Sequence, residues 1–296
     1  IPRGYLRTLL SSLLSASSGA ELSISCHYLR CMSTTRLTSG NRSIAGRVAI
    51  VSGAGSGIGR ATAHLFADEG ALVAVVDRNG EGVAQVVGEI SDAHGADRVK
   101  GWTVDVTDNA ALDALPDAVA EAFGGIDILI NNAGVVFNAD MTTTADVFDE
   151  AWDATLAVNI TSYARLTRAA LPYLMKSDGG RIVCTASTEG LGATGGIPAY
   201  NASKHAVIGL VRSLAVELGR HGITANAVCP GPIVTGMTAN IADEHKEIFA
   251  KRRVPVRRYG QPEEIAHGML NLVLPASSYM NGVILPVDGG MTSRHT

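Results

Sequence analysis

Beyond residue 45, short runs of apolar residues alternate with longer stretches in which apolar residues recur at helical spacing. Strands that read as continuous apolar runs are buried on both faces, as in parallel sheets covered by helices on each side. The predicted strands are 48–51, 72–76, 99–104, 126–130, 181–185, 224–228 and 283–285. The predicted helices are 58–69, 81–93, 109–123, 146–175, 199–219 and 262–272. This alternation predicts a single α/β domain with a doubly wound parallel sheet of about seven strands.

The first 44 residues have a different character. They are rich in serine, threonine and leucine, carry arginine at five positions and contain one acidic residue, Glu21. This composition resembles an organellar transit peptide. We favour the alternative, in which the protein starts at Met32 and residues 1–31 are an extension of no function. We therefore predict a disordered N-terminal extension over residues 1–44 and one folded domain over residues 45–296. The cytoplasm is the expected location, with a mitochondrion or another organelle as the alternative. The apolar stretch at residues 9–14 is too short to span a bilayer, so no membrane contact is expected.

The charge balance and the cysteines exclude some kinds of partner. Lysine and arginine number 24 against 28 acidic residues, a formal net charge of −4, which offers no basic surface to a nucleic acid. A basic cluster at residues 251–258 is interpreted first as a solvated surface or an oligomer contact and second as a patch for an anionic substrate. The four cysteines form no CxxC pair and the histidines show no ligand spacing, so plain thiols and no metal are expected.

A glycine-rich turn follows the first predicted strand. Gly53, Gly57 and Gly59 have the spacing GxxxGxG, and Ser56 and Ile58 lie between them. Glycines allow a sharp turn and a close backbone approach, so that a pyrophosphate can rest on the amides at the start of the next helix. The turn predicts a dinucleotide site on a Rossmann-type sheet, with a purely structural turn as the alternative.

Acidic residues follow the second and third predicted strands. Asp77 stands 18 residues after Gly59, where a carboxylate can accept both ribose hydroxyls of adenosine and repel the extra phosphate of NADP. It therefore predicts NAD(H) as the preferred cofactor and NADP(H) as the less favoured one, although the guanidinium of Arg78 can turn toward a 2′-phosphate. Asp105 and Val106 are candidates to flank the adenine ring, with a helix cap as the alternative for Asp105.

A tyrosine and a lysine supply candidate proton chemistry. Tyr200 and Lys204 are four residues apart at the start of a predicted helix, so their side chains share one face. A phenol with an ordinary pKa of about 10 exchanges protons poorly at neutral pH, but a nearby ammonium stabilises the phenolate and lowers that pKa. Taken alone, this spacing is also common on helix surfaces.

Together these motifs resemble the classical branch of the short-chain dehydrogenase/reductase family, in particular its 3-oxoacyl reductase-like and secondary-alcohol dehydrogenase members. The resemblance covers about residues 45–290. Beyond the residues above, it rests on the segments 131–134, 230–231 and 286–290, and on Asn159 and Ser187. It implies a small-molecule alcohol or ketone as substrate and a homo-oligomer, a tetramer or dimer.

The resemblance also implies a role for each site residue. Ser187 binds the reacting oxygen and Tyr200 exchanges a proton with it. Lys204 holds the nicotinamide ribose, and Asn159 keeps a water in the proton relay from Lys204 to solvent. The implied cofactor contacts are Asn132, Ala133 and Gly134 after the fourth strand, and Pro230, Gly231, Ile233 and Thr235 after the sixth.

The predicted activity is NAD(H)-dependent hydride transfer between a secondary alcohol and a ketone. A non-catalytic NAD-binding sensor or scaffold is the alternative from another class, and it predicts loss of Tyr200, Lys204 or Ser187, all of which are present. An epimerase or dehydratase is disfavoured by the compact C-terminal region. Substrate choice is expected to lie in residues 188–198 and 236–254, where Glu189 and Thr194 are candidate polar contacts and several apolar side chains are candidates for an apolar pocket.

Overall fold

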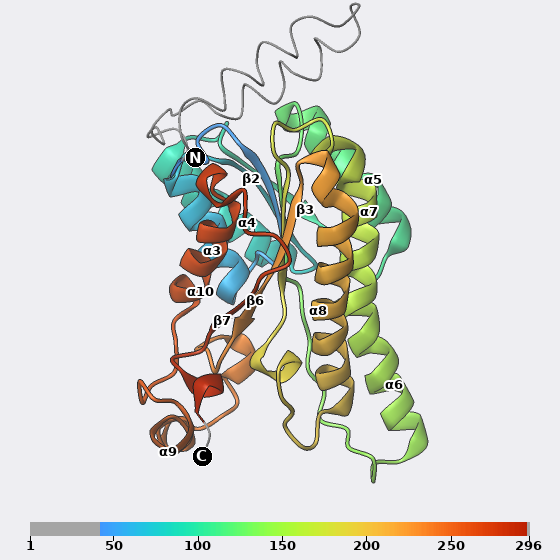
Figure 1. Ribbon diagram of the computed structural model, residues 1–296, viewed down its shortest axis with the longest axis vertical. Helices are drawn as coiled ribbons and strands as arrows, with labels where there is room; N and C mark the ends of the chain where they lie inside the picture. Colours follow the sequence, from blue (N-terminus) through green and yellow to red (C-terminus); the bar gives the residue numbers. More distant parts are fainter. Residues whose placement is uncertain (1–41, 295–296) are drawn as a thin grey trace, which may run out of the picture. The chain divides into compact units, whose positions relative to one another are not determined.

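The computed structural model describes residues 42–294, and these residues fold around a parallel sheet. Its strands are β1 (Val48–Ser52), β2 (Leu72–Asp77), β3 (Val99–Thr103), β4 (Ile128–Asn131), β5 (Arg181–Thr185), β6 (Thr224–Pro230) and β7 (Ile284–Val287). They lie in the order β3-β2-β1-β4-β5-β6-β7, which confirms the predicted doubly wound sheet of seven strands (Figure 1). The expected extension lies outside the described residues except for its last three, of which Ile44 is fully buried in the core.

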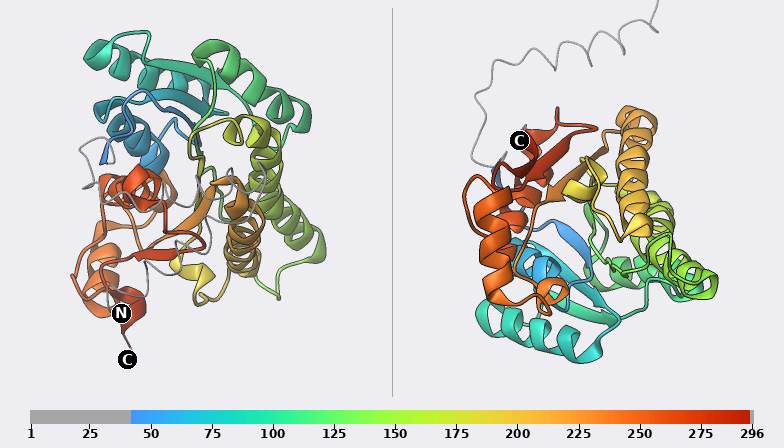
Figure 2. Two further views of the ribbon diagram at one scale, coloured as in Figure 1. Left: turned by 45° about the horizontal axis from the view of Figure 1, so that its top comes forward. Right: turned by 90° about the horizontal axis from the view of Figure 1, so that it is seen from below.

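Helices cover both faces of this sheet. One face carries α5 (Asn109–Phe123), α7 (Ser162–Leu174) and α8 (Pro198–Leu218), and the other carries α3 (Gly57–Asp68), α4 (Gly80–His94) and α10 (Pro262–Val273) (Figure 1). Figure 2 shows the two helical layers in two further views. Because side chains alternate along a strand, β1 sends Val48 and Ile50 into the first core and Ala49 and Val51 into the second. This burial on both faces explains the unbroken apolar runs of the strands. Among the described helices, none is both long and apolar enough to cross a bilayer.

The long helix predicted over residues 146–175 is instead two helices joined by a wider turn. α6 (Ala145–Leu156) is followed by the π-helical turn η2 (Ala157–Thr161) and then by α7. Within this turn, Nδ2 of Asn159 donates to the carbonyl oxygen of Val135 and Oδ1 accepts from the Val135 amide. Val135 lies in the loop after β4, far from the helix in sequence. Helical periodicity therefore could not reveal the wide turn, which is a common feature of functional sites.

A further helix, α9 (Asp243–Arg253), was not among those predicted from the sequence. Ala250 is its single buried residue, and most of the others are charged. A helix without an apolar stripe gives no periodic signal, so its sequence reads as a loop of mixed character. The basic cluster noted above begins in its last turn.

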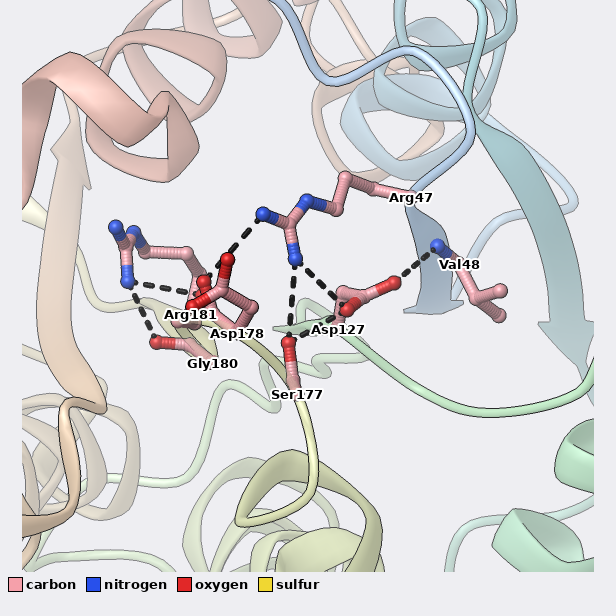
Figure 3. A network of polar contacts seen from close by, with 8 residues as sticks. Arg47, Val48, Asp127, Ser177, Asp178, Gly180 and Arg181 are labelled. Carbon is pink, nitrogen blue, oxygen red and sulfur yellow. Dashed lines mark hydrogen bonds and ion pairs between the residues drawn. The ribbon is translucent and has the colours of Figure 1, made fainter. Parts of the chain in front are cut away.

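The amino ends of the strands are joined by a polar network, drawn in Figure 3. Arg47, just before β1, donates from Nη1 to Oδ1 of Asp127 at 3.0 Å. The second carboxylate oxygen of Asp127 accepts the Val48 amide at 2.9 Å, and the hydroxyl of Ser177 donates to the first. Because all strands are parallel, their amino ends lie together and this network connects them. The carboxyl ends, at the other end of the strands, form the candidate site.

A second polar network ties α3 to α4 and supports a stability prediction. Glu89 on α4 pairs with Arg60 at 2.8 Å and with His64 at 2.8 Å. The hydrogen bond from Arg60 is the largest cause that lowers the pKa of Glu89 from 4.5 to about 2. An acid whose folded pKa is depressed adds stability above its unfolded pKa, and this stability is lost as the pH falls toward the folded value.

Glu89→Gln is therefore expected to lower the free energy of unfolding at pH 7 by about 1 kcal/mol, a modest value because the pair is partly exposed to solvent. The difference from the parent chain should shrink between pH 4.5 and pH 3, since the carboxyl pKa falls from 4.5 to about 2 on folding. Urea denaturation at pH 7, 5 and 3 measures it, with Glu121→Gln on the exposed face of α5 as the control. A pH-independent difference would contradict the assignment.

Candidate active site

The carboxyl ends of the strands carry nearly all residues predicted to form the site. The glycine turn follows β1, Asp77 ends β2, and the segment 131–134 begins at the end of β4. Ser187 follows β5, and the segment 230–235 begins at the last residue of β6. Residues from distant parts of the sequence therefore meet at one edge of the sheet, as expected for ligand sites in open α/β sheets.

The glycine turn can accept only glycine at two of its positions. Gly53 has a φ of +67°, and a Cβ there would lie 2.8 Å from the Cα of Ala133. At Gly59 a Cβ would lie 2.0 Å from the carbonyl oxygen of Gly53. Ser56 precedes α3 without a side-chain cap, and no acidic residue occupies the first turn of this helix. Its first amides therefore remain available to a pyrophosphate, as the sequence predicted.

The carboxylate of Asp77 is held beside this turn by backbone amides. Oδ2 accepts from Gly55 at 3.0 Å and Oδ1 accepts from Asn79 at 2.9 Å. A Cβ on Gly55 would lie 3.0 Å from the carboxyl carbon, so a larger residue there would push against this carboxylate. Asp77 is thus oriented in advance where a ribose hydroxyl would be bound.

Asp105 and Val106, the two residues predicted to flank the adenine ring, differ in exposure, since Asp105 is exposed and Val106 is buried. Asp105 accepts the amide and hydroxyl of Thr107, and these hydrogen bonds lower its pKa, with the charge of Arg78 as a smaller cause. The cap of α5 is Asp108 rather than Asp105, so the alternative reading of Asp105 as that cap is wrong. Val106 is nearly buried in the core beneath α5.

The lysine of the Tyr-x-x-x-Lys pair is almost completely buried. Lys204 is 2% exposed, and its Nζ donates to the carbonyl oxygen of Thr185 at 2.8 Å. The same nitrogen lies 5.5 Å from the ring centre of Tyr200 and 5.8 Å from that of Tyr163. Ser187 is also buried, and its Oγ accepts the Glu189 amide at 3.1 Å. Surface decoration, the ordinary explanation for this spacing, therefore does not apply.

Burial dominates the pKa values of this pair. It raises the pKa of the Tyr200 phenol, against a lowering by hydrogen bonding from Ser187, and the charge of Glu189 raises it further. It also lowers the pKa of Lys204 to about 8. The sequence predicted that Lys204 would lower the pKa of Tyr200. Among the chain's own groups the pKa of Tyr200 is raised instead, because burial, which disfavours the phenolate, is its largest cause.

Asn159 joins the wide turn η2 to α8, the helix that carries Tyr200 and Lys204. It is fully buried, and besides its two bonds to Val135 its Nδ2 donates to the hydroxyl of Ser203 at 3.0 Å. A Cβ on Gly134 would lie 3.6 Å from Oδ1 of Asn159 and 3.7 Å from Nζ of Lys204. Asn159 and Lys204 therefore approach the same point of the backbone after β4, which is glycine in this chain.

A family model described as Enoyl-(Acyl carrier protein) reductase matches residues 53–292, which include this whole arrangement. The chain belongs to the short-chain dehydrogenase/reductase family. It is 37% identical over 246 residues to the 3-oxoacyl-[acyl-carrier-protein] reductase FabG of Thermotoga maritima, covering 83% of this chain and 98% of that protein. It is also 37% identical over 249 residues to the D-threitol dehydrogenase of Mycolicibacterium smegmatis, covering 84% of this chain and 94% of the relative.

A solved structure from Beutenbergia cavernae is similar throughout the fold. It is described as an NAD(P) dependent gluconate 5-dehydrogenase with NADP bound at low occupancy. The two share 36% identity with a TM-score of 0.79, covering 86% of this chain and 100% of the other. As a short-chain dehydrogenase/reductase, the chain is an NAD(P)-dependent oxidoreductase that acts on CH–OH groups.

Two predicted cofactor contacts of this short-chain dehydrogenase/reductase have other partners within the chain. Nδ2 of Asn132 donates to the carbonyl oxygens of Ser52 and Gly53, and its Oδ1 accepts from Thr185. The Asn132 amide therefore braces the glycine turn. Ala133 lies in contact distance of that turn, as the close approach at Gly53 shows.

The segment after β6 reaches back to the glycine turn. A Cβ on Gly57 would lie 3.3 Å from the methyl group of Thr235, and Ile233 forms an isolated bridge with Gly260. Pro230 ends β6, and a Cβ on Gly231 would lie 2.8 Å from the Cα of Asp288. Thr235 and the turn thus lie against each other, while Gly231 permits close packing on the end of β7.

Sequence reasoning missed two residues around Lys204. Tyr163 is fully buried on α7, and its hydroxyl donates to the carbonyl oxygen of Ala133 at 2.9 Å. Thr185 provides the carbonyl that accepts from Lys204. The spacing of Tyr163, four residues after Asn159, was the available signal for it. No pattern marks the carbonyl of Thr185. Across residues 42–294, no group of three or more His, Cys, Asp or Glu side chains is placed to hold a metal ion.

Proposed function

We propose that the chain is an NAD(H)-dependent oxidoreductase that interconverts a secondary alcohol and a ketone, and that it works in the reducing cytoplasm. The observation that carries the activity is the buried ammonium of Lys204, 5.5 Å from the ring centre of Tyr200 and hydrogen-bonded at the end of the strand that leads to Ser187. The free thiols of Cys184 and Cys229 are compatible with that compartment.

The bound nicotinamide supplies the hydride acceptor or donor, and the chain's own residues handle the oxygen and its proton. The hydroxyl of Ser187 binds the reacting oxygen of the substrate. The phenol of Tyr200 takes the proton of an alcohol or gives one to a ketone. Lys204 holds the nicotinamide ribose and adds positive charge beside the phenol, and Asn159 lies beside it on the proposed path of the proton to solvent.

The glycine turn, its uncapped helix and Asp77 fit a dinucleotide with a free adenosine ribose. A carboxylate fixed by two backbone amides is a poor neighbour for a 2′-phosphate because it cannot turn away without losing both bonds. This supports NAD(H) over NADP(H). The remaining predicted cofactor positions of the site are proposed as further contacts of the same dinucleotide. The Beutenbergia cavernae relative has NADP bound. If this chain also preferred NADP, Arg78 would be the group that binds the 2′-phosphate.

Turnover tests the proposed activity. The purified chain is mixed with NAD and secondary alcohols, or with NADH and ketones including 3-oxoacyl thioesters, while absorbance of the reduced cofactor is followed. We expect turnover of at least one alcohol and ketone pair. A chain that binds NAD but turns over no member of the panel would favour the sensor alternative.

We further propose that α6 packs against a second copy of the chain. Thr155 is its single buried residue, whereas Phe148 and Trp152 stack at 5.8 Å between ring centres while partly exposed, and Val147 is 52% exposed. An apolar helix face of this kind is usually covered by a partner. Light scattering after size exclusion is expected to show a dimer or tetramer that Trp152→Glu converts to smaller species. Ile248→Glu on α9 is the control, and a monomeric parent would contradict the proposal.

A further inference from the structure

Two side-chain oxygens on residues close in sequence to Ser187 and Tyr200 are buried and have no hydrogen-bond donor among the described residues. They are Oε2 of Glu189 and Oδ1 of Asn201. Glu189 lies two residues after Ser187, and Asn201 is the residue after Tyr200. The other unpartnered buried atoms belong to Asn131, Arg165, Arg181 and Thr224, none of which is a neighbour of the reacting groups in sequence. The two oxygens therefore stand out as a feature of the active site.

Thr194 makes a hydrogen bond with each of these two side chains. Its hydroxyl donates to Oε1 of Glu189 at 3.0 Å, and its carbonyl oxygen accepts Nδ2 of Asn201 at 2.8 Å. The second contact determines which end of the Asn201 amide is unpartnered, because a flipped amide would put its oxygen against the Thr194 carbonyl. Both unpartnered atoms are therefore acceptors.

A second restraint fixes Glu189 relative to the reacting groups. Its backbone amide donates to Oγ of Ser187 at 3.1 Å. Its negative charge is close enough to Tyr200 to raise the pKa of the phenol. The carboxylate thus belongs to the same cluster as the two groups that would bind the substrate oxygen.

Two acceptors buried without a donor are unfavourable, since a polar group removed from water loses its hydrogen bonds. A ligand that brings hydrogen-bond donors to this place would restore them. The same acceptors would repel a carboxylate or phosphate. The donor is better neutral than cationic, because Lys204 and an oxidised nicotinamide already place positive charge around Tyr200.

We infer that Glu189 and Asn201 bind a further hydroxyl group of the substrate, next to the carbon that is oxidised, and so select polyhydroxylated alcohols over simple secondary alcohols. This inference rests on the proposed function. The additional hydroxyl donates to Glu189, while the reacting hydroxyl contacts Ser187 and Tyr200. A site that hydrogen-bonds a substrate hydroxyl discriminates strongly against the analogue that lacks it, because its polar groups are then left unpaired.

The test compares substrates that differ by one hydroxyl, 2,3-butanediol and 2-butanol, with erythritol as a second polyol. For the parent chain we expect kcat/KM with NAD to be at least about tenfold higher for the diol than for 2-butanol. Glu189→Met, which keeps the chain length and removes the acceptors, should lower the ratio of kcat/KM for the diol over 2-butanol by about tenfold or more. The ratio is the readout because loss of the Glu189 charge also changes the pKa of Tyr200, which acts on both substrates. Glu189→Gln and Asn201→Ala should fall between the parent and Glu189→Met.

The control is Glu217→Met, an exposed glutamate near the end of α8, the helix that also carries Asn201. It should change kcat/KM for neither substrate. Equal losses on both substrates in Glu189→Met would overturn the inference, since they would reveal a general effect on Ser187 or Tyr200. Equal kcat/KM for diol and 2-butanol in the parent chain would overturn it as well, while leaving the proposed activity intact. A chain that oxidises neither but turns over another alcohol or ketone of the panel would overturn this inference and leave the proposed function intact. A chain that turns over no member of the panel would contradict both.

Discussion

Tyr200→Phe is expected to lower kcat by about a thousandfold, the largest effect of any single substitution in the chain. The change removes one hydroxyl and keeps the ring that lies 5.5 Å from Lys204. The phenol is the group that we propose to exchange the proton of the substrate oxygen, so its loss should remove that step. Cofactor binding should stay within about threefold of the parent chain, because the ribose contacts of Lys204 remain. Stopped assays of NADH formation and fluorescence titration with NADH measure the two effects.

A matched control for this variant lies on the other side of the lysine. Tyr163→Phe removes a buried hydroxyl whose ring is 5.8 Å from the same nitrogen, and it breaks one hydrogen bond to the carbonyl of Ala133. It should lower kcat less than tenfold while reducing the free energy of unfolding by about 1 kcal/mol. If Tyr200→Phe kept the parental rate on the best substrate, the assignment of the proton donor would be wrong. Similar losses in both variants would indicate a shared effect on Lys204 instead.

Asp77→Ala is expected to change the ratio of kcat/KM for NAD over NADP by about a hundredfold in favour of NADP. The substitution removes the acceptor proposed for the adenosine ribose and the negative charge that opposes a 2′-phosphate. It also frees the amides of Gly55 and Asn79, which the carboxylate occupies in this chain and which are donors for a phosphate. The exposed Arg78 then supplies a positive charge at the same place.

Steady-state kinetics with both cofactors and one substrate measure this change. Asp92→Ala, at an exposed position on α4, is the control for loss of a surface carboxylate and should leave the ratio unaltered. A parent chain that already prefers NADP would contradict the proposed preference whatever the variant does. A loss with NAD that is matched by an equal loss with NADP would show that Asp77 only supports the turn.

Most of the fold was predictable from the sequence because its signals are local. A strand that is buried on both faces needs apolar residues at every position, so each strand appears in the sequence as a continuous apolar run. The side chains of β1, which alternate between the two cores, are an example. The helices that were predicted have apolar stripes facing those cores, whereas α9 was missed because Ala250 is its single buried residue. The glycine turn was likewise predictable, since the positive φ of Gly53 and the close approach at Gly59 leave little choice of residue.

The candidate site was predictable only in part. Its residues could be placed at one edge of the sheet, since each follows a strand and the strands are parallel. Their partners could not be predicted. The Asn132 amide is committed to the glycine turn, and Asn159 holds Val135 from a widened helical turn. Glu189 was a candidate polar contact, but its unpartnered oxygen is visible only once the position of Thr194 is known.

By itself the sequence determined the layered sheet, the ends of the strands at which the candidate site lies and the glycine turn, because these depend on residues close together in the chain. The tertiary structure alone decided the environment of each reacting group. It raised the pKa of Tyr200 where the sequence predicted a lowering, and it placed the Lys204 ammonium 5.5 and 5.8 Å from the centres of two phenol rings. Burial and the distances between charges are set by segments far apart in sequence, which no local pattern encodes.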